Sequence, residues 1–559
     1  MSRLRFSRAR PLLFALSSAT LLIASFPNFN QPWCAWAALV PWLLLLRKRT
    51  LRSPFWWSYA IGLLFFLVSM WWLVHVTLVG WIILCVYLAL YFGLFGLIVS
   101  RLCLQPRTSN LQRLLVVSAS WVALEFARSH LLSGMGWNLL AYSQAGWPIV
   151  IQFADVTGAW GVSFVIVLVN VAIAESLGRR TRAKRRGSKS WASMIHLRIM
   201  SAGILLVAFG YGAWRLHNTR GAGAVRIAVV QGNIPQEEKW DEEHQQSIIE
   251  RYEALTQQVA ASHPDLIVWP ETSVPGYFGV DEALTQRVLT LARTLKIPML
   301  VGAPMLRLHA TQFLLSNSAA LVDPAGTIVS RYDKVHLVPF GEFIPFERNL
   351  PWLRQALPPI GDFVPGHEYT VFTAPVRNSE FGIRSDHSAF RLPAAPRRRH
   401  GTPHSALKFS VLICFEDVFP ELARRFVQHG AQALLVITND AWFGPTAAAY
   451  QHVQASTFRA IELRVPVIRA ANTGWSGCID PFGRWCGSVR DTKGAELFVA
   501  GTHTCDVMPG TARSFYQRWG DWFAWVCVII LGTVLVPGIV LLLRAKRTKN
   551  ENRPRSRVH

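Results

Sequence analysis

The sequence predicts a helical membrane domain of about eight transmembrane helices joined to an α/β domain. One observation is composition: the 559 residues are 51% hydrophobic, include 23 tryptophans and have a mean hydropathy of +0.26, values typical of integral membrane proteins. The other observation is the order of the apolar regions along the chain. Two strongly apolar regions flank a less apolar one, in which short apolar runs alternate with helical patterns. A chain of this length also exceeds one ordinary domain.

Eight apolar stretches are candidates to cross the hydrocarbon core, which takes about 20 helical residues. They lie near residues 11–27, 32–46, 55–76, 79–100, 114–131, 159–177, 199–216 and 520–543. The second and fifth are the weakest, and Glu125 and Arg128 in the fifth should face protein or the membrane interface rather than lipid. The first follows four arginines, as in a signal peptide. Because no small-residue cleavage site follows it, we interpret it as a retained helix.

Basic residues predict the orientation of these helices. With eight spans, the Lys- and Arg-rich stretches at the N-terminus, at 47–52, 101–113 and 179–198, and after Leu543 all fall on one side. By the positive-inside rule both termini are cytoplasmic. The formal charge of +24 is then mainly a topology signal, and its scatter over separate loops argues against nucleic-acid binding. The expected parts are a membrane domain (1–216), a less apolar domain on the far side (217–518), a last helix (519–543) and a basic tail (544–559).

The middle region has the pattern of an α/β domain. Apolar strand candidates lie at 225–232, 265–271, 298–304, 318–326, 409–416 and 433–440, and helical patterns include 243–262 and 420–431. Strands that are apolar throughout indicate a sheet covered on both faces. Residues 374–407, rich in Pro, Arg, His and Ser, interrupt this pattern. We expect them to form an exposed inserted loop without a core of its own.

Three reactive side chains stand at the ends of predicted strands. Glu271 follows DLIVWP, Lys334 lies in RYDKVHLVPFGE, and Cys414 ends VLIC. Singly, each has an ordinary interpretation, as a turn carboxylate, a surface lysine or an inert core thiol. Together they supply a general base, a cation for an oxyanion and a nucleophile that reacts as its thiolate. This combination favours acyl transfer through a thioester.

The stretches WPET, YDKVHLVPFGE and ICFED resemble the Glu–Lys–Cys motifs of the nitrilase superfamily, and nearly the whole chain resembles the apolipoprotein N-acyltransferase family. QGNIPQEEKW, WNLLAYSQ and HLVPFGEFIP share that resemblance. It implies an αββα sandwich with Glu271 as base, Lys334 as oxyanion stabiliser and Cys414 as nucleophile. Glu342 would support the lysine. Glu416 would be a supporting carboxylate or a favourable helix-start charge.

The resemblance also bears on the residues around the nucleophile. Trp240 would lie on a mobile loop near the lipid entrance, or serve simply for packing or as an interfacial anchor. The family often has tyrosine after the nucleophile, whereas this chain has Phe415, which rules out a hydroxyl role there. The segment FERNLPWLRQAL (346–357) is either an arm that touches lipid or an ordinary surface helix.

The resemblance implies substrates that are anchored in a bilayer. The donor would be a membrane phospholipid, typically phosphatidylethanolamine, and the acceptor the α-amino group of the diacylglyceryl-cysteine of an apolipoprotein. The expected location is the bacterial inner membrane, with a periplasmic catalytic domain. We expect a monomer without a cofactor or metal. Two other functions stay open: a membrane-anchored amidohydrolase and a non-catalytic scaffold. The multi-span domain argues against the first, and the filled triad against the second.

The eight cysteines form no CxxC pair and no zinc-ligand spacing. Cys478 and Cys486 flank DPFGR, which is typical of a hairpin turn. If the far compartment is oxidising, these two residues are candidates for a disulfide. Cys414 would have to stay reduced.

Overall fold

The structure is a computed structural model that describes residues 2–48, 51–103, 109–186, 189–217, 225–309, 312–345, 347, 349, 354, 362–376, 406–510 and 513–551. The chain divides into two compact units. One comprises Met1–Trp214 together with Trp519–His559, and the other comprises Arg215–Arg518.

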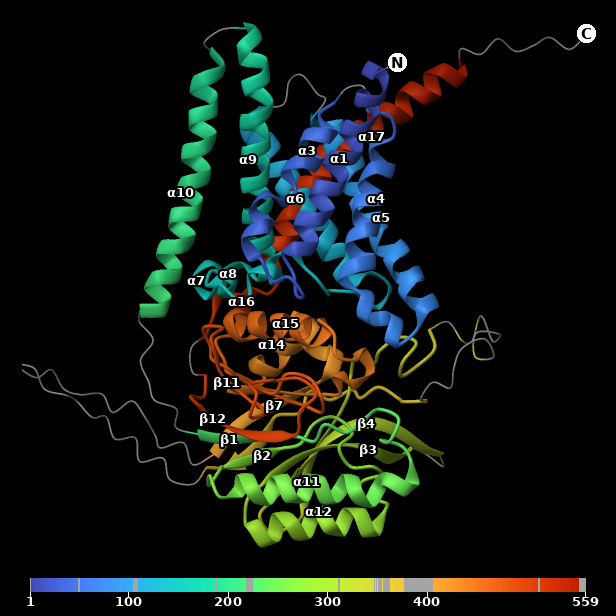
Figure 1. Ribbon diagram of the computed structural model, residues 1–559, viewed down its shortest axis with the longest axis vertical. Coiled ribbons are helices and arrows are strands. Elements are labelled where there is room, and N and C mark those ends of the chain that lie inside the picture. Colours follow the sequence, from blue (N-terminus) through green and yellow to red (C-terminus); the bar gives the residue numbers. More distant parts are fainter. Residues whose placement is uncertain are drawn as a thin grey trace, which may run out of the picture. The chain divides into compact units, whose positions relative to one another are not determined.

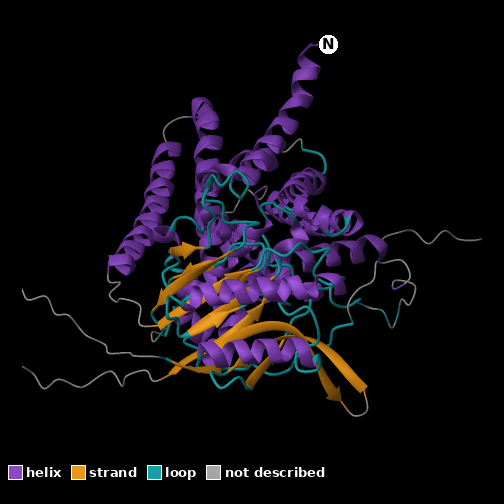
Figure 2. Ribbon diagram, turned by 60° about the horizontal axis from the view of Figure 1, so that its bottom comes forward, coloured by secondary structure: helices purple, strands orange, loops and turns teal. Residues whose placement is uncertain are grey.

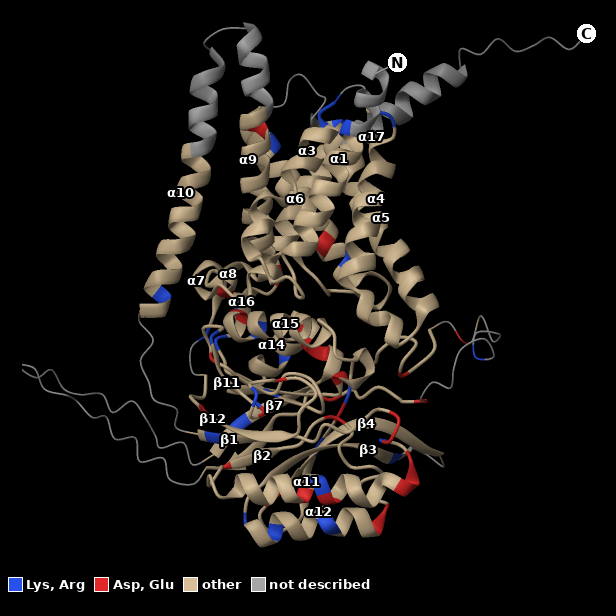
Figure 3. Ribbon diagram, viewed as in Figure 1, with Lys and Arg blue, Asp and Glu red and all other residues tan. Residues whose placement is uncertain are grey.

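The first unit is built of helices (Figure 1). They are α1 (Ser2–Ala24), α2 (Ala35–Ala38), α3 (Val40–Leu46), α4 (Pro54–Ser69), α5 (Leu78–Cys103), α6 (Asn110–His130), α7 (Pro148–Ile151), α8 (Ala154–Thr157), α9 (Ala159–Arg186), α10 (Lys189–His217) and α17 (Trp522–Glu551). Within the described residues, three stretches are long and apolar enough to cross a membrane: Leu78–Arg101, Ala159–Leu177 and Ile199–His217. The other apolar stretches of described helix are 10–17 residues long, and the fifth predicted span, in α6, belongs to neither group, so the number eight stays a prediction. Figure 3 shows few charged residues along the described parts of these helices.

Local sequence explains where several helices differ from the predicted spans. The stretch 32–46 is broken into a 3₁₀ turn, α2 and α3, and α3 begins with a proline in its first turn, where the missing N–H costs nothing. Helix α6 begins at a capping box, in which Ser109 and Gln112 bond each other's backbone N–H groups. Glu125 and Arg128 are buried inside the helical unit, which confirms that they face protein.

The second unit contains two six-stranded sheets packed face to face, with helices on their outer faces (Figures 1 and 2). The sheet orders are β12-β1-β2-β3-β4-β5 and β11-β10-β9-β8-β7-β6. The strands are β1 (Val225–Gln231), β2 (Leu266–Val268), β3 (Met299–His309), β4 (Gln312–Val322), β5 (Ile328–Asp333), β6 (Phe372–Pro375), β7 (Ala406–Ile413), β8 (Ala433–Thr438), β9 (Val467–Ala471), β10 (Gly477–Ile479), β11 (Trp485–Ser488) and β12 (Gly501–Val507). The helices are α11 (Gln245–Ala260), α12 (Glu282–Leu295), α14 (Pro420–Gln428), α15 (Ala448–Leu463) and α16 (Phe515–Trp519).

Alternation along the strands fills two separate cores. In β1, Ile227 and Val229 face the second sheet and join the core between the sheets. Ala228 and Val230 face the other way and pack with residues of α11 and α12, such as Tyr252. Both faces of the strand are therefore buried, which explains why its sequence is apolar throughout. The two-sheet α/β fold expected for this region is confirmed.

The segment inserted between β6 and β7 is shorter than the predicted 374–407. Ala374 in β6 pairs with Leu407 in β7, and each is only 1% exposed. Both residues therefore belong to the core of the second sheet rather than to an exposed loop. Residues 377–405 lie outside the described part of the chain, as does most of the segment 346–357. The C-terminal helix also differs from expectation, because α17 continues past residue 543 to Glu551.

The suggested pairing of Cys478 with Cys486 is wrong. Cys478 in β10 forms a disulfide with Cys505 in β12, with 6.0 Å between the Cα atoms. The register of the β10–β11 hairpin places Cys478 opposite Gly487, and a bulge displaces Cys486 from a paired position. Since β10 and β12 belong to different sheets, the disulfide links the two sheets covalently.

Candidate active site

The three predicted catalytic side chains emerge at ends of strands in the second unit. Glu271 lies in the turn after β2, Lys334 directly follows β5 and Cys414 directly follows β7. Strand β2 is parallel to β3, β3 is antiparallel to β4, and β4 is antiparallel to β5. Strands β2 and β5 therefore run in the same direction, and their carboxyl ends lie on the same side of the first sheet. Cys414 comes from the other sheet with a φ of 54°, a left-handed conformation that non-glycine residues rarely adopt. Such strained residues cluster at active sites.

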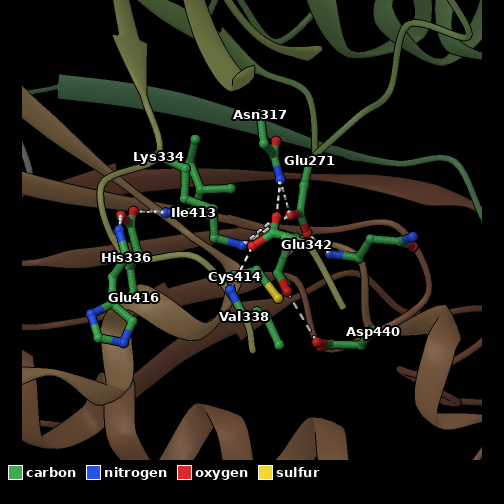
Figure 4. Close-up of polar contacts among 12 residues, drawn as sticks. Glu271, Asn317, Lys334, His336, Val338, Glu342, Ile413, Cys414, Glu416 and Asp440 are labelled. Carbon is green, nitrogen blue, oxygen red and sulfur yellow. Dashed lines mark hydrogen bonds and ion pairs between the residues drawn. The ribbon is translucent and has the colours of Figure 1, made fainter. Parts of the chain in front are cut away.

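Lys334 is buried between two carboxylates (Figure 4). Its Nζ lies 2.9 Å from Oε1 of Glu342 and 3.6 Å from Oε1 of Glu271. The amide of Asn317 donates to both carboxylates, at 2.7 Å to Glu271 and 2.8 Å to Glu342. Burial opposes the charge of the lysine, but Glu342 and Glu271 outweigh it and raise its pKa above the usual value. Lys334 therefore remains an ammonium.

The thiol of Cys414 rests in its protonated form. Burial raises its pKa most, and the negative charges of Glu271 and Asp440 add to this, while Lys334 and the Thr438 hydroxyl oppose it. The net pKa lies well above that of a free cysteine. Because the nucleophile is the thiolate, the site needs a base close to the sulfur. Glu271 is the carboxylate that couples most strongly to it.

Glu271 is held from both sides of the site. Its Oε1 accepts from Asn317, and its Oε2 accepts from the backbone N–H of Asn439 at 2.8 Å. The turn that carries it also packs against Gly302 in β3, where an added Cβ would meet the Pro270 carbonyl oxygen at 2.2 Å. A residue larger than glycine there would displace the base. The carboxylate thus has a fixed position toward Cys414 and Lys334.

Glu416 is fully buried and joins the segments that carry the lysine and the cysteine. It accepts four hydrogen bonds, at 2.8–3.0 Å, from the hydroxyl of Tyr332 and the backbone N–H groups of Val335, His336 and Ile413. Burial raises its pKa to about 7, although these bonds oppose the shift. The contacts correspond to a supporting carboxylate rather than to a helix-start charge alone.

The other predicted site residues take different positions. Glu342 also accepts from the Val338 N–H at 2.8 Å, which closes a short loop behind Lys334. The ring of Phe415 packs edge-on against Phe419, with 5.0 Å between the ring centroids. Trp240 is 52% exposed on the loop after β1 and lies next to the buried Lys239.

A buried ion cluster underneath the nucleophile was not predicted. His452 of α15 lies 2.8 Å from Asp417 and 3.1 Å from Asp440, and Arg469 of β9 lies 2.7 Å from Asp417. The His452 ring also lies 3.2 Å from the carbonyl oxygen of Cys414. Burial lowers the pKa of His452, but Asp417 and Asp440 outweigh burial and Arg469 and raise it to about 9. The cluster thus places an imidazolium against the backbone of the nucleophile.

Two further residues were missed. Asn317 interrupts the apolar strand β4 between two serines, and a buried amide in a strand is a detectable signal. Lys239 follows two glutamates in a polar stretch and had no such signal.

Among the described residues, one group has the spacing of metal ligands: Cys478, His503 and Cys505. The sulfurs of Cys478 and Cys505 are bonded to each other as a disulfide, so they are not thiolate ligands.

The chain is similar to known proteins over nearly its full length. It matches the family model of the apolipoprotein N-acyltransferase N-terminal domain at residues 18–172 and that of carbon-nitrogen hydrolases at residues 226–501. An apolipoprotein N-acyltransferase of Geobacter metallireducens is 35% identical, covering 93% of both chains. One of Chlorobaculum tepidum is 30% identical, covering 95% of this chain and 97% of the relative. Among solved structures, an amidase of the nitrilase superfamily from Nesterenkonia AN1 is 18% identical over 54% of this chain and 95% of its own, with a TM-score of 0.36, too low to bear on function.

Proposed function

This chain belongs to the apolipoprotein N-acyltransferase family, and from that premise we propose that it transfers a fatty acyl chain from a membrane phospholipid to the N-terminal amine of an apolipoprotein. The acceptor is the α-amino group of the diacylglyceryl-cysteine, and phosphatidylethanolamine is the donor. The observation that carries the proposal is that the buried Glu271 and Lys334, 3.6 Å apart, share one site with the partly buried Cys414, whose thiol couples electrostatically to both. A base, a cation and a thiol in one site are the components of thioester chemistry.

In the first half-reaction, Cys414 attacks the ester carbonyl of the phospholipid while Glu271 takes the thiol proton. The ammonium of Lys334 stabilises the oxyanion of the tetrahedral adduct. The adduct collapses as the C–O bond to the glycerol breaks, and protonated Glu271 returns the proton to the leaving lysophospholipid. A thioester on Cys414 and a neutral lysophospholipid result.

In the second half-reaction, the acceptor amine attacks the thioester. Glu271 removes a proton from the nitrogen, the C–S bond breaks, and the Cys414 sulfur recovers a proton from Glu271. The products are an amide on the lipoprotein and the free enzyme. Since the donor product leaves before the acceptor reacts, the kinetics should be ping-pong.

We place the protein in the bacterial inner membrane, with its catalytic domain in the periplasm and its termini in the cytoplasm. The basic stretches on the predicted cytoplasmic side support this orientation. The Cys478–Cys505 disulfide supports it independently, since disulfides persist in oxidising compartments such as the periplasm.

Intact mass spectrometry tests the proposal directly. The purified full-length protein is incubated with phosphatidylethanolamine, beside Cys414→Ala and, as a matched control, Cys486→Ala, which removes an exposed free thiol of the same domain. We expect a hydroxylamine-sensitive fatty-acyl adduct that maps to Cys414, is absent from Cys414→Ala and persists in Cys486→Ala. Addition of a diacylated lipopeptide should discharge it as triacylated product. Absence of both adduct and lysophospholipid would refute the proposal and favour an amidohydrolase or a scaffold.

A further inference from the structure

Lys239 lies inside the candidate site although it belongs to none of the Glu–Lys–Cys motifs. It is 2% exposed, and its Nζ donates to the backbone carbonyl oxygen of Glu271 at 3.0 Å. It stands on the loop after β1, immediately before the exposed Trp240. A lysine is rarely buried unless it is paired or has a function, because removal of its charge from water is costly.

The surroundings of Lys239 make it sensitive to the charge of the site. Burial lowers its pKa to about 8, while the negative forms of Glu271 and Cys414 raise it. Electrostatic coupling is reciprocal: if a thiolate favours the ammonium, the ammonium favours the thiolate by the same free energy. Lys239 thus stands on another loop than Lys334, beside the backbone of Glu271, and without the carboxylate contacts that hold Lys334.

The loop that carries Lys239 is fixed to the strand ends of the second sheet. The amide of Asn439 donates to Gln236 at 2.7 Å. Asn472 donates to the carbonyl of Ile234 at 2.8 Å and accepts from its N–H at 2.9 Å. These bonds hold the loop on the second sheet, and the bond from Lys239 to the Glu271 carbonyl joins it to the turn after β2, so the ammonium of Lys239 has a defined place near Glu271.

We propose that Lys239 is a second active-site cation, a positioning residue whose ammonium holds the backbone of Glu271 and stabilises the thiolate of Cys414. The inference rests on the proposed function for its role in acyl transfer, but the effect on the thiol needs no lipid. The groups that act most strongly on the pKa of this thiol are Glu271, Lys334, Asp440 and the Thr438 hydroxyl, and His452 lies at the Cys414 carbonyl.

The test measures the rate at which iodoacetamide alkylates Cys414 between pH 6 and 10, by peptide mapping of the full-length protein in detergent. Lys239→Met removes the charge and the donor, whereas Lys239→Gln removes the charge and keeps an N–H donor for the Glu271 carbonyl. Lys239→Arg keeps both. Lys408→Met removes an exposed lysine from β7, the strand that leads to Cys414, and serves as the control.

We expect both neutral variants to alkylate Cys414 about tenfold more slowly at pH 6–7, where Lys239 is charged, and we expect this difference in rate to shrink as pH rises above the Lys239 pKa of about 8. Lys239→Arg and Lys408→Met should stay within about threefold of the native rate. If Cys414 is alkylated at the native rate in Lys239→Gln but more slowly in Lys239→Met, the electrostatic role is overturned, and Lys239 acts only through its hydrogen bond to the Glu271 carbonyl. Should the Met variant not fold, the Gln and Arg variants decide the question alone.

The acyl-adduct assay separates this inference from the proposed function. If the Lys239 variants shift the alkylation profile but the native protein never forms an acyl adduct, the proposed acyltransferase function is refuted and the role of Lys239 as a second cation stands. If Lys239→Gln is alkylated at the native rate and the native protein forms the acyl adduct, the role of Lys239 as a second cation is refuted and the proposed acyltransferase function stands.

Discussion

The Nζ of Lys334 lies 2.9 Å from Oε1 of Glu342, closer than it lies to the carboxylate of Glu271. Glu342 therefore provides the main ion pair of the lysine, and Glu271 is left able to exchange a proton with the nucleophile. The two carboxylates share the same amide donor, Asn317, so a change in one is felt by the other. In the proposed mechanism, the site thus divides its negative charge between Glu342, which holds the lysine, and Glu271, which reacts.

Replacement of Glu342 by glutamine should slow acyl-adduct formation without abolishing it. A hydrogen bond to a charged group contributes about 1.5–3 kcal/mol, so we expect a decrease of roughly 10- to 100-fold. Glu271→Gln should form no detectable adduct, because the site then lacks its base. Single-turnover acylation by phosphatidylethanolamine measures both rates. Equal rates for the two variants would show that the roles assigned to the carboxylates are wrong.

Glu416→Gln should change how stability depends on pH. The pKa of Glu416 is raised in the folded protein to about 7. The protonated carboxyl therefore contributes fully to the free energy of unfolding below the unfolded pKa, and this contribution is lost as pH rises through 7. Glutamine does not titrate, and the stability of native protein relative to Glu416→Gln should therefore fall between pH 4.5 and 7. Thermal unfolding at several pH values measures this difference. Exposed Glu421→Gln is the control, and a relative stability that rises over this range would contradict the prediction.

The imidazolium of His452 should produce a loss of stability at alkaline pH. Its pKa is raised to about 9, so its contribution is fully present below about pH 6.5 and is lost as pH rises through 9. His452→Gln should show a weaker decline over that range. It should also be less stable by about 3–5 kcal/mol at neutral pH, because Asp417 and Asp440 lose a buried partner. Denaturant unfolding at pH 6 and 9 tests both effects; parallel declines in the two proteins would argue against a charged histidine.

Loss of the inter-sheet disulfide should destabilise the catalytic domain. Cys478→Ala/Cys505→Ala removes a cross-link of a kind that typically contributes about 2–4 kcal/mol. Cys486→Ala, which touches no disulfide, should unfold like the native protein. Unfolding under non-reducing conditions compares the three proteins. If the double variant and Cys486→Ala unfold alike, the disulfide does not form in the native protein.

The boundaries of the insertion can be tested by two nested deletions. Removal of 378–404 keeps β6 and the start of β7, so acyl transfer should stay within a few-fold of the native rate. Removal of 374–407 deletes the buried pair Ala374 and Leu407 and should leave the protein unfolded or inactive. Activity and thermal unfolding measure the contrast. Full activity of the longer deletion would mean that this strand pair is dispensable.

The sequence pointed to the three candidate catalytic residues in two ways: Glu271 and Cys414 follow apolar runs, whereas Lys334 follows the polar run SRYD and was identified through the resemblance of its motif. Glu271, Lys334 and Cys414 stand where a strand must end, and the ends of strands in an α/β sheet are where sites form. The structure adds what spacing cannot show. Glu416 had two open interpretations, and the four donors that distinguish them come from segments up to 84 residues away.

The failures have a common physical origin. Cys478 was matched to its neighbour along a hairpin, whereas its partner lies on the other sheet, and contacts between sheets depend on layer packing rather than on sequence spacing. Lys239 was missed for a similar reason. In a run of polar residues a lysine is typically at the surface, and only the docking of its loop onto two sheets buries it.

The pairing of β1 with β12 brings Val225 opposite Val507, so the first strand of the catalytic domain completes its sheet with the last. This has a consequence for biosynthesis. At about 5–20 residues per second, the ribosome needs on the order of 15–50 s to deliver the partner of β1. During that interval one edge of a very apolar strand stays open to aggregation or to a chaperone. A nascent chain stalled before residue 501 should therefore remain sensitive to protease throughout this domain, and release of β12 should protect it in one step.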